Sequence, residues 1–210
     1  MHRSNRRGYA PALFILLVCW AMSTHATTVR PMNILDLIDR ADTIVAGRVE
    51  HVSDGFTAAG MPYTEVTVRV LDHLRGANGQ SLTFRQFGLS APRVLPNGKV
   101  YLGGRPEGWP TWNVGEVSLL FLYPSARVTG FRTTVGLGFG KLGMGNGVAV
   151  NAHDNVGLFA NVEIDRSRLS ADEQKMFDAK NGPVNAATLR NFIRRTAAAR
   201  PVPGSAANAP

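Results

Sequence analysis

The sequence predicts a mainly β fold, a small closed barrel or a sandwich, with a short helix before the strands and two helices after them. Two observations predict this class. Apolar and polar residues alternate in several segments, most clearly in residues 64–71, and this period of two is typical of a strand with one buried face. Glycine- and proline-rich stretches, such as residues 54–62, separate these segments and indicate turns.

The remaining strands follow from similar patterns. They are predicted at residues 43–52, 81–87, 116–123, 131–135, 141–144 and 148–151. The segment 116–123 is apolar on both faces, which indicates a strand that is covered on both sides. Gly145, Asn146 and Gly147 separate the last two strands and favour a tight hairpin. Residues 88–115 are expected to form a loop.

Three helices are predicted from residues that satisfy the free backbone donors of a first turn. Asn33 is expected to cap a short helix that precedes the strands. Ser170 and Glu173 have the spacing of a capping box and begin a helix that ends near Lys180. Asn185 is expected to cap the last helix.

The first 26 residues are typical of a cleavable signal peptide. Three arginines precede an apolar run at residues 10–22, and small residues lead to a cleavage site after Ala26. The run is too short to cross a bilayer, which takes about 20 residues. We therefore expect a periplasmic or secreted protein without a membrane span after signal cleavage.

Export has consequences for covalent chemistry and for charge. Cys19 is the only cysteine and lies in the leader, so the exported chain would form neither a disulfide nor a thiolate metal site. The formal net charge of +8 falls by three, to +5, when the leader arginines are removed. Because export is expected, no nucleic-acid partner is expected.

The predicted organisation has four parts. Residues 1–26 are the signal peptide and residues 27–165 the β-barrel domain. Residues 166–199 form a helical pair packed on the barrel, and residues 200–210, rich in alanine and proline, are expected to be a disordered tail.

No catalytic, cofactor or metal site is predicted from the motifs. Residues 138–143 match the glycine spacing of a nucleotide-binding turn, but a hairpin follows them where that turn needs a helix. His51, His73 and His153 lack the short spacings of zinc ligands. Residues 151–155 are rich in oxygen ligands but lack the spacing of a calcium loop, so we expect a turn there.

Two tryptophans are the candidate binding residues. Trp109 and Trp112 lie in the proline- and glycine-rich segment 88–115. In such a position a tryptophan either plugs the end of a barrel or forms a contact patch for a partner. The plug is the interpretation we favour, and the contact patch stays open as the alternative.

Residues 41–122 resemble a known family. The segments that carry the resemblance are Ala41–Val49, Tyr63-Thr64, Val70–Gly76, Gly115-Glu116 and Leu119–Leu122. Their order is similar to that of the netrin-like module, of the inhibitory domain of tissue inhibitors of metalloproteinases, and of a broad group of uncharacterised exported bacterial proteins.

The resemblance implies a five-stranded barrel of the oligonucleotide/oligosaccharide-binding (OB) type that is used for protein contact. The OB-like barrel would carry the short N-terminal helix and the two C-terminal helices. The family's inhibitors chelate a protease zinc through an N-terminal cysteine, and this chain has none after residue 19. The resemblance therefore assigns no functional residue here.

The sequence favours an exported, non-enzymatic binding module that binds a protein or another component of the cell envelope through loops such as residues 88–115, a protease being one option. Two alternatives stay open. One is a hydrolase whose site forms only when distant residues converge, and the other is a structural envelope protein. The partner's identity, the oligomeric state and the strand order do not follow from the sequence.

Overall fold

The computed structural model describes residues 31–102 and 104–202. They belong to one compact unit, Pro31–Pro210. The predicted signal peptide and residues 203–210 of the predicted tail lie outside the described residues. Within the part of the chain that is described, no helix has the length and apolar character needed to cross a membrane.

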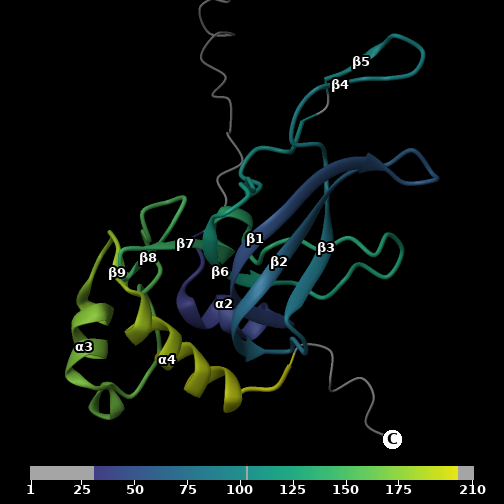
Figure 1. The fold of residues 1–210 in the computed structure, drawn as a ribbon. Coiled ribbons are helices and arrows are strands. Elements are labelled where there is room, and N and C mark those ends of the chain that lie inside the picture. The colour runs from purple at the N-terminus through teal and green to yellow at the C-terminus, as the bar shows by residue number, and fades with distance from the viewer. Residues whose placement is uncertain (1–30, 103, 203–210) are drawn as a thin grey trace, which may run out of the picture. The chain divides into compact units, whose positions relative to one another are not determined.

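A seven-stranded antiparallel sheet with the order β3-β2-β1-β6-β7-β8-β9 is the main element of this unit (Figure 1). Its strands are β1 (Thr43–Phe56), β2 (Pro62–Arg75), β3 (Ser81–Phe87), β6 (Val117–Leu122), β7 (Lys141–Gly145), β8 (Val148–Asn151) and β9 (Val184–Asn185). A separate two-stranded sheet consists of β4 (Arg93–Val94) and β5 (Val100–Tyr101). The expected loop at residues 88–115 thus contains a short hairpin, which the sequence analysis missed.

The prediction of a mainly β fold is confirmed, but a closed five-stranded barrel is not. The sheet has seven strands, and its two end strands, β3 and β9, do not pair with each other. The predicted strand at residues 131–135 is wrong as a regular strand, since it forms a single isolated bridge, between Leu122 and Thr134. Leu137 follows with a φ of 58° and opens the short 3₁₀ helix Leu137–Gly140, so the chain turns away before a longer ladder forms.

The segment 131–135 nevertheless makes backbone contacts on two sides. On the side of β6, Val135 N donates to Phe121 O at 2.8 Å and Tyr123 N donates to Thr133 O at 3.0 Å. On the side of β3, Arg132 N donates to Arg85 O at 2.8 Å. This segment therefore lies between β6 and β3 without completing the sheet.

The α-helices begin at the residues that the sequence indicates. They are α2 (Ile34–Arg40), α3 (Ala171–Asp178) and α4 (Ala186–Ala198). Asn33 caps α2, and Ser170 and Glu173 form the predicted capping box of α3. Asn185 caps α4 by accepting hydrogen bonds from the backbone of the first turn. The predicted β7–β8 hairpin is also present, with φ angles of 49° at Asn146 and 77° at Gly147.

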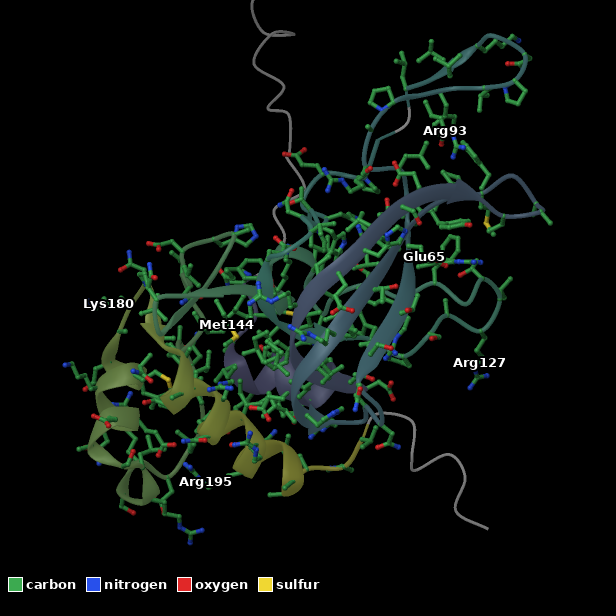
Figure 2. The ribbon with its side chains drawn as sticks, in the orientation of Figure 1. Glu65, Arg93, Arg127, Met144, Lys180 and Arg195 are labelled. Atoms are coloured by element: carbon green, nitrogen blue, oxygen red, sulfur yellow. The ribbon has the colours of Figure 1, made fainter. Side chains whose placement is uncertain are left out.

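Side chains on the two faces of the sheet form two apolar cores. The larger core joins the sheet to the three helices and includes Ile34, Leu37, Ile38, Ile44, Ala46, Leu119, Phe121, Leu142, Phe177, Leu189, Phe192 and Ile193. The smaller core consists of Val45, Val49, Val66, Val68, Phe84, Trp112, Leu120 and Leu122. Figure 2 shows how densely side chains fill the space around the sheet. Alternate residues of β1 and β6 enter opposite cores, as expected for strands that are buried on both faces.

Candidate functional site

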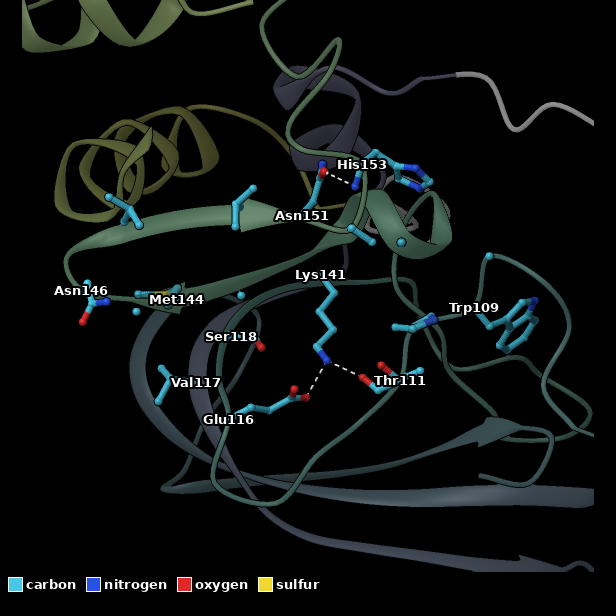
Figure 3. A pocket seen from close by; sticks show the side chains of 18 residues that line it. Trp109, Thr111, Glu116, Val117, Ser118, Lys141, Met144, Asn146, Asn151 and His153 are labelled. Carbon is cyan, nitrogen blue, oxygen red and sulfur yellow. Dashed lines mark hydrogen bonds and ion pairs between the residues drawn. The ribbon is translucent and has the colours of Figure 1, made fainter. Parts of the chain in front are cut away.

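A groove of about 670 Å³ lies over strands β6, β7 and β8, and we take it as the candidate site (Figure 3). The loop at residues 108–111 forms one wall, and the β7–β8 hairpin and the start of β6 form the rest. This volume falls in the range of about 300–1,000 Å³ that is common for ligand pockets.

The floor of the groove is poor in side chains. Across the sheet, Ser118 of β6 pairs with Gly47 of β1 on one side and with Gly143 of β7 on the other. Gly145, two residues after Gly143, also lines the groove. Because Gly143 and Gly145 carry no side chain, backbone is exposed there where a strand would normally present side chains, whereas Gly47 is buried against Val68.

Ser118 is one of two groove residues with a buried polar atom that has no hydrogen-bond partner among the described residues; the other is Asn151, through its Nδ2. Ser118 is only 1% exposed, and its unpartnered atom is the hydroxyl oxygen. A buried hydroxyl without a partner costs about 1–3 kcal/mol. Ser118 lies on the same face of the sheet as Gly143, so its hydroxyl is directed to the groove side.

Lys141 and Glu116 form an ion pair at one end of the groove. The distance from Lys141 Nζ to Glu116 Oε1 is 2.5 Å, and the side chains are 12% and 23% exposed. Lys141 Nζ also donates to Thr111 O and lies 4.6 Å from the centre of the Trp112 ring. Figure 3 shows Lys141 reaching from β7 to both oxygens. The charge of Lys141 is therefore balanced by Glu116, and its side chain connects the loop at Thr111 to the sheet.

The two predicted tryptophans do not form one patch. Trp112 is 7% exposed and packs edge-on against Phe84, with 5.4 Å between the ring centres. Its Nε1 donates to Gln86 Oε1 at 3.2 Å, which satisfies the one polar group of the indole. Trp112 is thus part of the smaller core.

Trp109, in contrast to Trp112, lies partly at the surface. It is half-buried and contributes to one end of the groove. Its ring contacts Phe87, with 6.4 Å between the centres, and Figure 3 shows the indole directed away from Lys141. Of the two tryptophans, only Trp109 therefore has appreciable exposed surface.

The three histidines lie apart. His51 on β1 and His73 on β2 are exposed, and their register positions are six residues apart along β1. At about 3.3 Å per residue this separates them by about 20 Å. His153 follows β8 and stacks on Phe139, with 4.1 Å between the ring centres. Across the described ranges, no three His, Cys, Asp or Glu side chains are grouped so that they could hold a metal ion.

The glycine motif at residues 138–143 has a structural role. Its first part belongs to the 3₁₀ helix Leu137–Gly140 and its second part to β7, so no α-helix begins there. A Cβ atom on Gly140 would overlap the carbonyl oxygen of Val135. The motif thus permits a close backbone approach, as expected from its context.

The oxygen-rich segment 151–155 is a turn in the structure. Asn151 Oδ1 accepts hydrogen bonds from the backbone N–H groups of His153, at 2.9 Å, and Asn155, at 3.0 Å. Asn155 Oδ1 in turn accepts from Asn151 N at 3.0 Å. These side-chain oxygens hold the turn together.

The sequence analysis missed the residues that define the groove: Ser118, Gly143, Gly145, Lys141 and Glu116. Two signals were available. Ser118 is the single polar residue of an otherwise apolar strand, and glycine recurs at alternate positions of β7. Neither signal shows that the two strands are neighbours, because that pairing is made by the fold. Comparison of the chain with family models, curated proteins and solved structures finds no match.

Proposed function

We propose that this chain is an exported, non-enzymatic binding module that takes a segment of a partner protein into the groove over β6, β7 and β8. The observation that carries the proposal is the hydroxyl of Ser118, which is buried in the groove wall and finds no partner in the described part of the chain. Buried polar groups are normally hydrogen-bonded, and an unpaired one at a groove is explained if a ligand supplies the partner.

The lining favours an uncharged and largely apolar occupant. Val117, Val148 and Val150 provide apolar surface along the groove. The charges of Lys141 and Glu116 neutralise each other, so a charged ligand would have to break their ion pair. A short apolar stretch of polypeptide fits this chemistry, with one of its carbonyl groups accepting from Ser118.

The proposal extends to the fold family. We place the chain with netrin-like modules, with an OB-like barrel built from β1, β2, β3, residues 131–135 and β6. The supporting observations are the backbone bonds of residues 131–135 to β6 and β3, and the smaller core, to which β1, β2, β3 and β6 contribute. In this barrel Trp112 is the plug, and Trp109 contacts the partner at the rim of the groove.

Export to the periplasm or the exterior is also part of the proposal, on the evidence of residues 1–26. A partner in the cell envelope would then be within reach. The hydrolase alternative required the histidines to converge, and the separate positions of His51, His73 and His153 argue against that particular site.

Site-specific photo-crosslinking in cells tests the proposal. A photoreactive amino acid at Val148 or Val150, in the groove, is expected to give a cross-linked partner protein, whereas the same group at Val128 is not. Val128 is 97% exposed and lies outside the groove, so it controls for simple accessibility.

A second variant blocks the groove without disturbing the sheet. A Cβ atom on Gly145 would meet no atom within 4 Å, so Gly145→Leu fills the groove at little cost to folding. It is expected to remove the cross-link, while Ala58→Leu, at the exposed β1–β2 turn, is expected to leave it unchanged. Equal cross-linking from Val128, or a cross-link that survives Gly145→Leu, would overturn the proposal.

A further inference from the structure

The β4–β5 hairpin, residues 93–102, extends from the rest of the unit in Figure 1, and we refer to it as the arm. One face of the arm is attached to β1. The ring of Tyr101 meets Phe56 edge-on, with 5.5 Å between the centres, and the Arg93 guanidinium carbon lies 5.8 Å from the centre of the Phe56 ring. Arg93 also donates to Asp54 O at 3.1 Å.

The opposite face of the arm is apolar and exposed. Val94 is 67% exposed, Val100 54% and Leu102 76%. Val94 pairs with Val100 across the hairpin, and Leu102 lies two residues beyond Val100, so the three side chains share one face. Contiguous exposed aliphatic surface of this kind marks an interaction site.

The charge of this segment indicates what the face meets. Residues 88–106 contain no Asp or Glu, and Lys99 is exposed between the two strands of the arm. Arg93 lies on the opposite face with Tyr101, and Arg105 donates to Pro110 O at 3.3 Å. An aliphatic face with an exposed lysine beside it complements an anionic phospholipid surface, because the aliphatic groups enter the interface while the lysine meets a headgroup. Peripheral binding of this kind needs no membrane-spanning helix.

The chemistry of the face favours lipid over protein. Protein interfaces depend most on aromatic residues and arginine. In the arm these residue types are Tyr101 and Arg93, and both are turned inward onto Phe56. The exposed face presents only aliphatic side chains, whose burial in lipid needs no shape complementarity.

We infer that the arm is a membrane-surface anchor, in which Val94, Val100 and Leu102 insert into the interfacial region of an anionic bilayer. This inference does not depend on the groove. A protein can bind lipid through the arm whatever the groove holds, and the two proposals are tested by different variants.

Vesicle co-sedimentation tests the inference, with the compact unit Pro31–Pro210 and vesicles of phosphatidylglycerol mixed with phosphatidylcholine. The unit is expected to bind these vesicles and to bind pure phosphatidylcholine weakly. Replacing Val94, Val100 and Leu102 together by serine is expected to lower the partition coefficient about a hundredfold, because three buried aliphatic groups are lost. Lys99→Ala is expected to lower it about fivefold.

Val128→Ser is the matched control, because this valine is 97% exposed on a different loop. It is expected to leave vesicle binding unchanged, and circular dichroism of every variant checks that the fold is intact. Absence of binding to anionic vesicles, or equal binding by the triple serine variant, would overturn the inference. So would a triple variant that loses self-association or a protein partner while its vesicle binding is unchanged, since the face would then be a protein interface.

Discussion

Arg75 Nη2 lies 2.8 Å from the carbonyl oxygen of Ala197, and this hydrogen bond joins the end of β2 to the last turn of α4. The same guanidinium donates to Ile38 O at 2.5 Å and Ala41 O at 3.2 Å, where α2 ends. Carbonyl groups at the ends of helices lack partners within the helix, so one buried arginine satisfies the ends of two helices.

Replacing Arg75 is therefore expected to separate the helices from the sheet. Arg75→Met leaves buried carbonyl groups unpaired, and we expect a loss of about 3 kcal/mol in the free energy of unfolding, measured by urea denaturation. Arg69→Met is the control, since the side chain of Arg69 is 54% exposed and its pair with Glu50, at 3.3 Å, lies at the surface. A loss no greater than that of Arg69→Met would show that the helix ends do not need Arg75.

Because of Glu173, the free energy of unfolding is expected to depend on pH in the acid range. Burial by itself raises the pKa of the Glu173 carboxyl, but hydrogen bonds from Ser170 and the pairing with Arg195 outweigh it and lower the pKa below its ordinary value. In the unfolded chain the pKa is about 4.3. The contribution of Glu173 to the free energy of unfolding is therefore complete above that pH. It is lost as the pH falls through the lower pKa that Glu173 has in the folded protein.

Glu173→Gln is accordingly expected to destabilise the protein at neutral pH, and the difference from the wild type is expected to shrink in acid. Urea denaturation at a series of pH values measures this difference. Asp178→Asn is the control, because the side chain of Asp178 is 66% exposed in its pair with Arg166. A Glu173→Gln deficit that is constant down to acid pH would contradict the expectation.

Ser118→Ala is expected to stabilise the protein. It removes a buried hydroxyl that has no partner within residues 31–102 and 104–202, and we expect a gain of about 1 kcal/mol in the free energy of unfolding. The same change is expected to weaken cross-linking from the groove, since the ligand loses a hydrogen bond. Ser81→Ala, at an exposed position of β3, serves as the control. A marked loss of stability in Ser118→Ala would mean that the hydroxyl has a structural partner.

Two glycines of the same region are expected to respond differently to alanine. A Cβ atom on Gly140 would overlap Val135 O and lie 2.9 Å from Val135 N, so Gly140→Ala should cost about 2–3 kcal/mol. A Cβ atom on Gly145 has no neighbour within 4 Å, so Gly145→Ala should be neutral or slightly stabilising. Thermal unfolding of the two variants compares them directly, and equal melting temperatures would refute the role assigned to Gly140.

The predicted and observed structures agree where a feature depends on neighbouring residues. Asn33, Ser170 and Asn185 cap helices as expected, because each accepts a hydrogen bond from a backbone group two or three residues away. The predicted strand at residues 131–135 was wrong because its pairing depends on distant parts of the chain. The segment makes a few backbone bonds to β6 and β3, but the positive φ of Leu137 and the 3₁₀ helix that follows prevent a longer ladder.

Trp109 and Trp112 illustrate how far sequence reasoning reached into the candidate site. The sequence placed both in one loop, and it could not distinguish the core residue from the surface residue. That difference arises from Phe84 and Gln86, which meet Trp112 across more than twenty residues of chain. The groove was likewise invisible, because it exists only where Ser118 and Gly143 become neighbours.

The sequence by itself determined the mainly β class, the starts of the helices and the β7–β8 turn. Periodicity, capping and turn geometry act over a few residues, so they can be read along the chain. The tertiary structure alone decided that the sheet stays open, that Arg75 ties two helix ends together, and that glycines and a serine line one groove. These features depend on contacts between distant residues, and such contacts are fixed only when the two cores are packed.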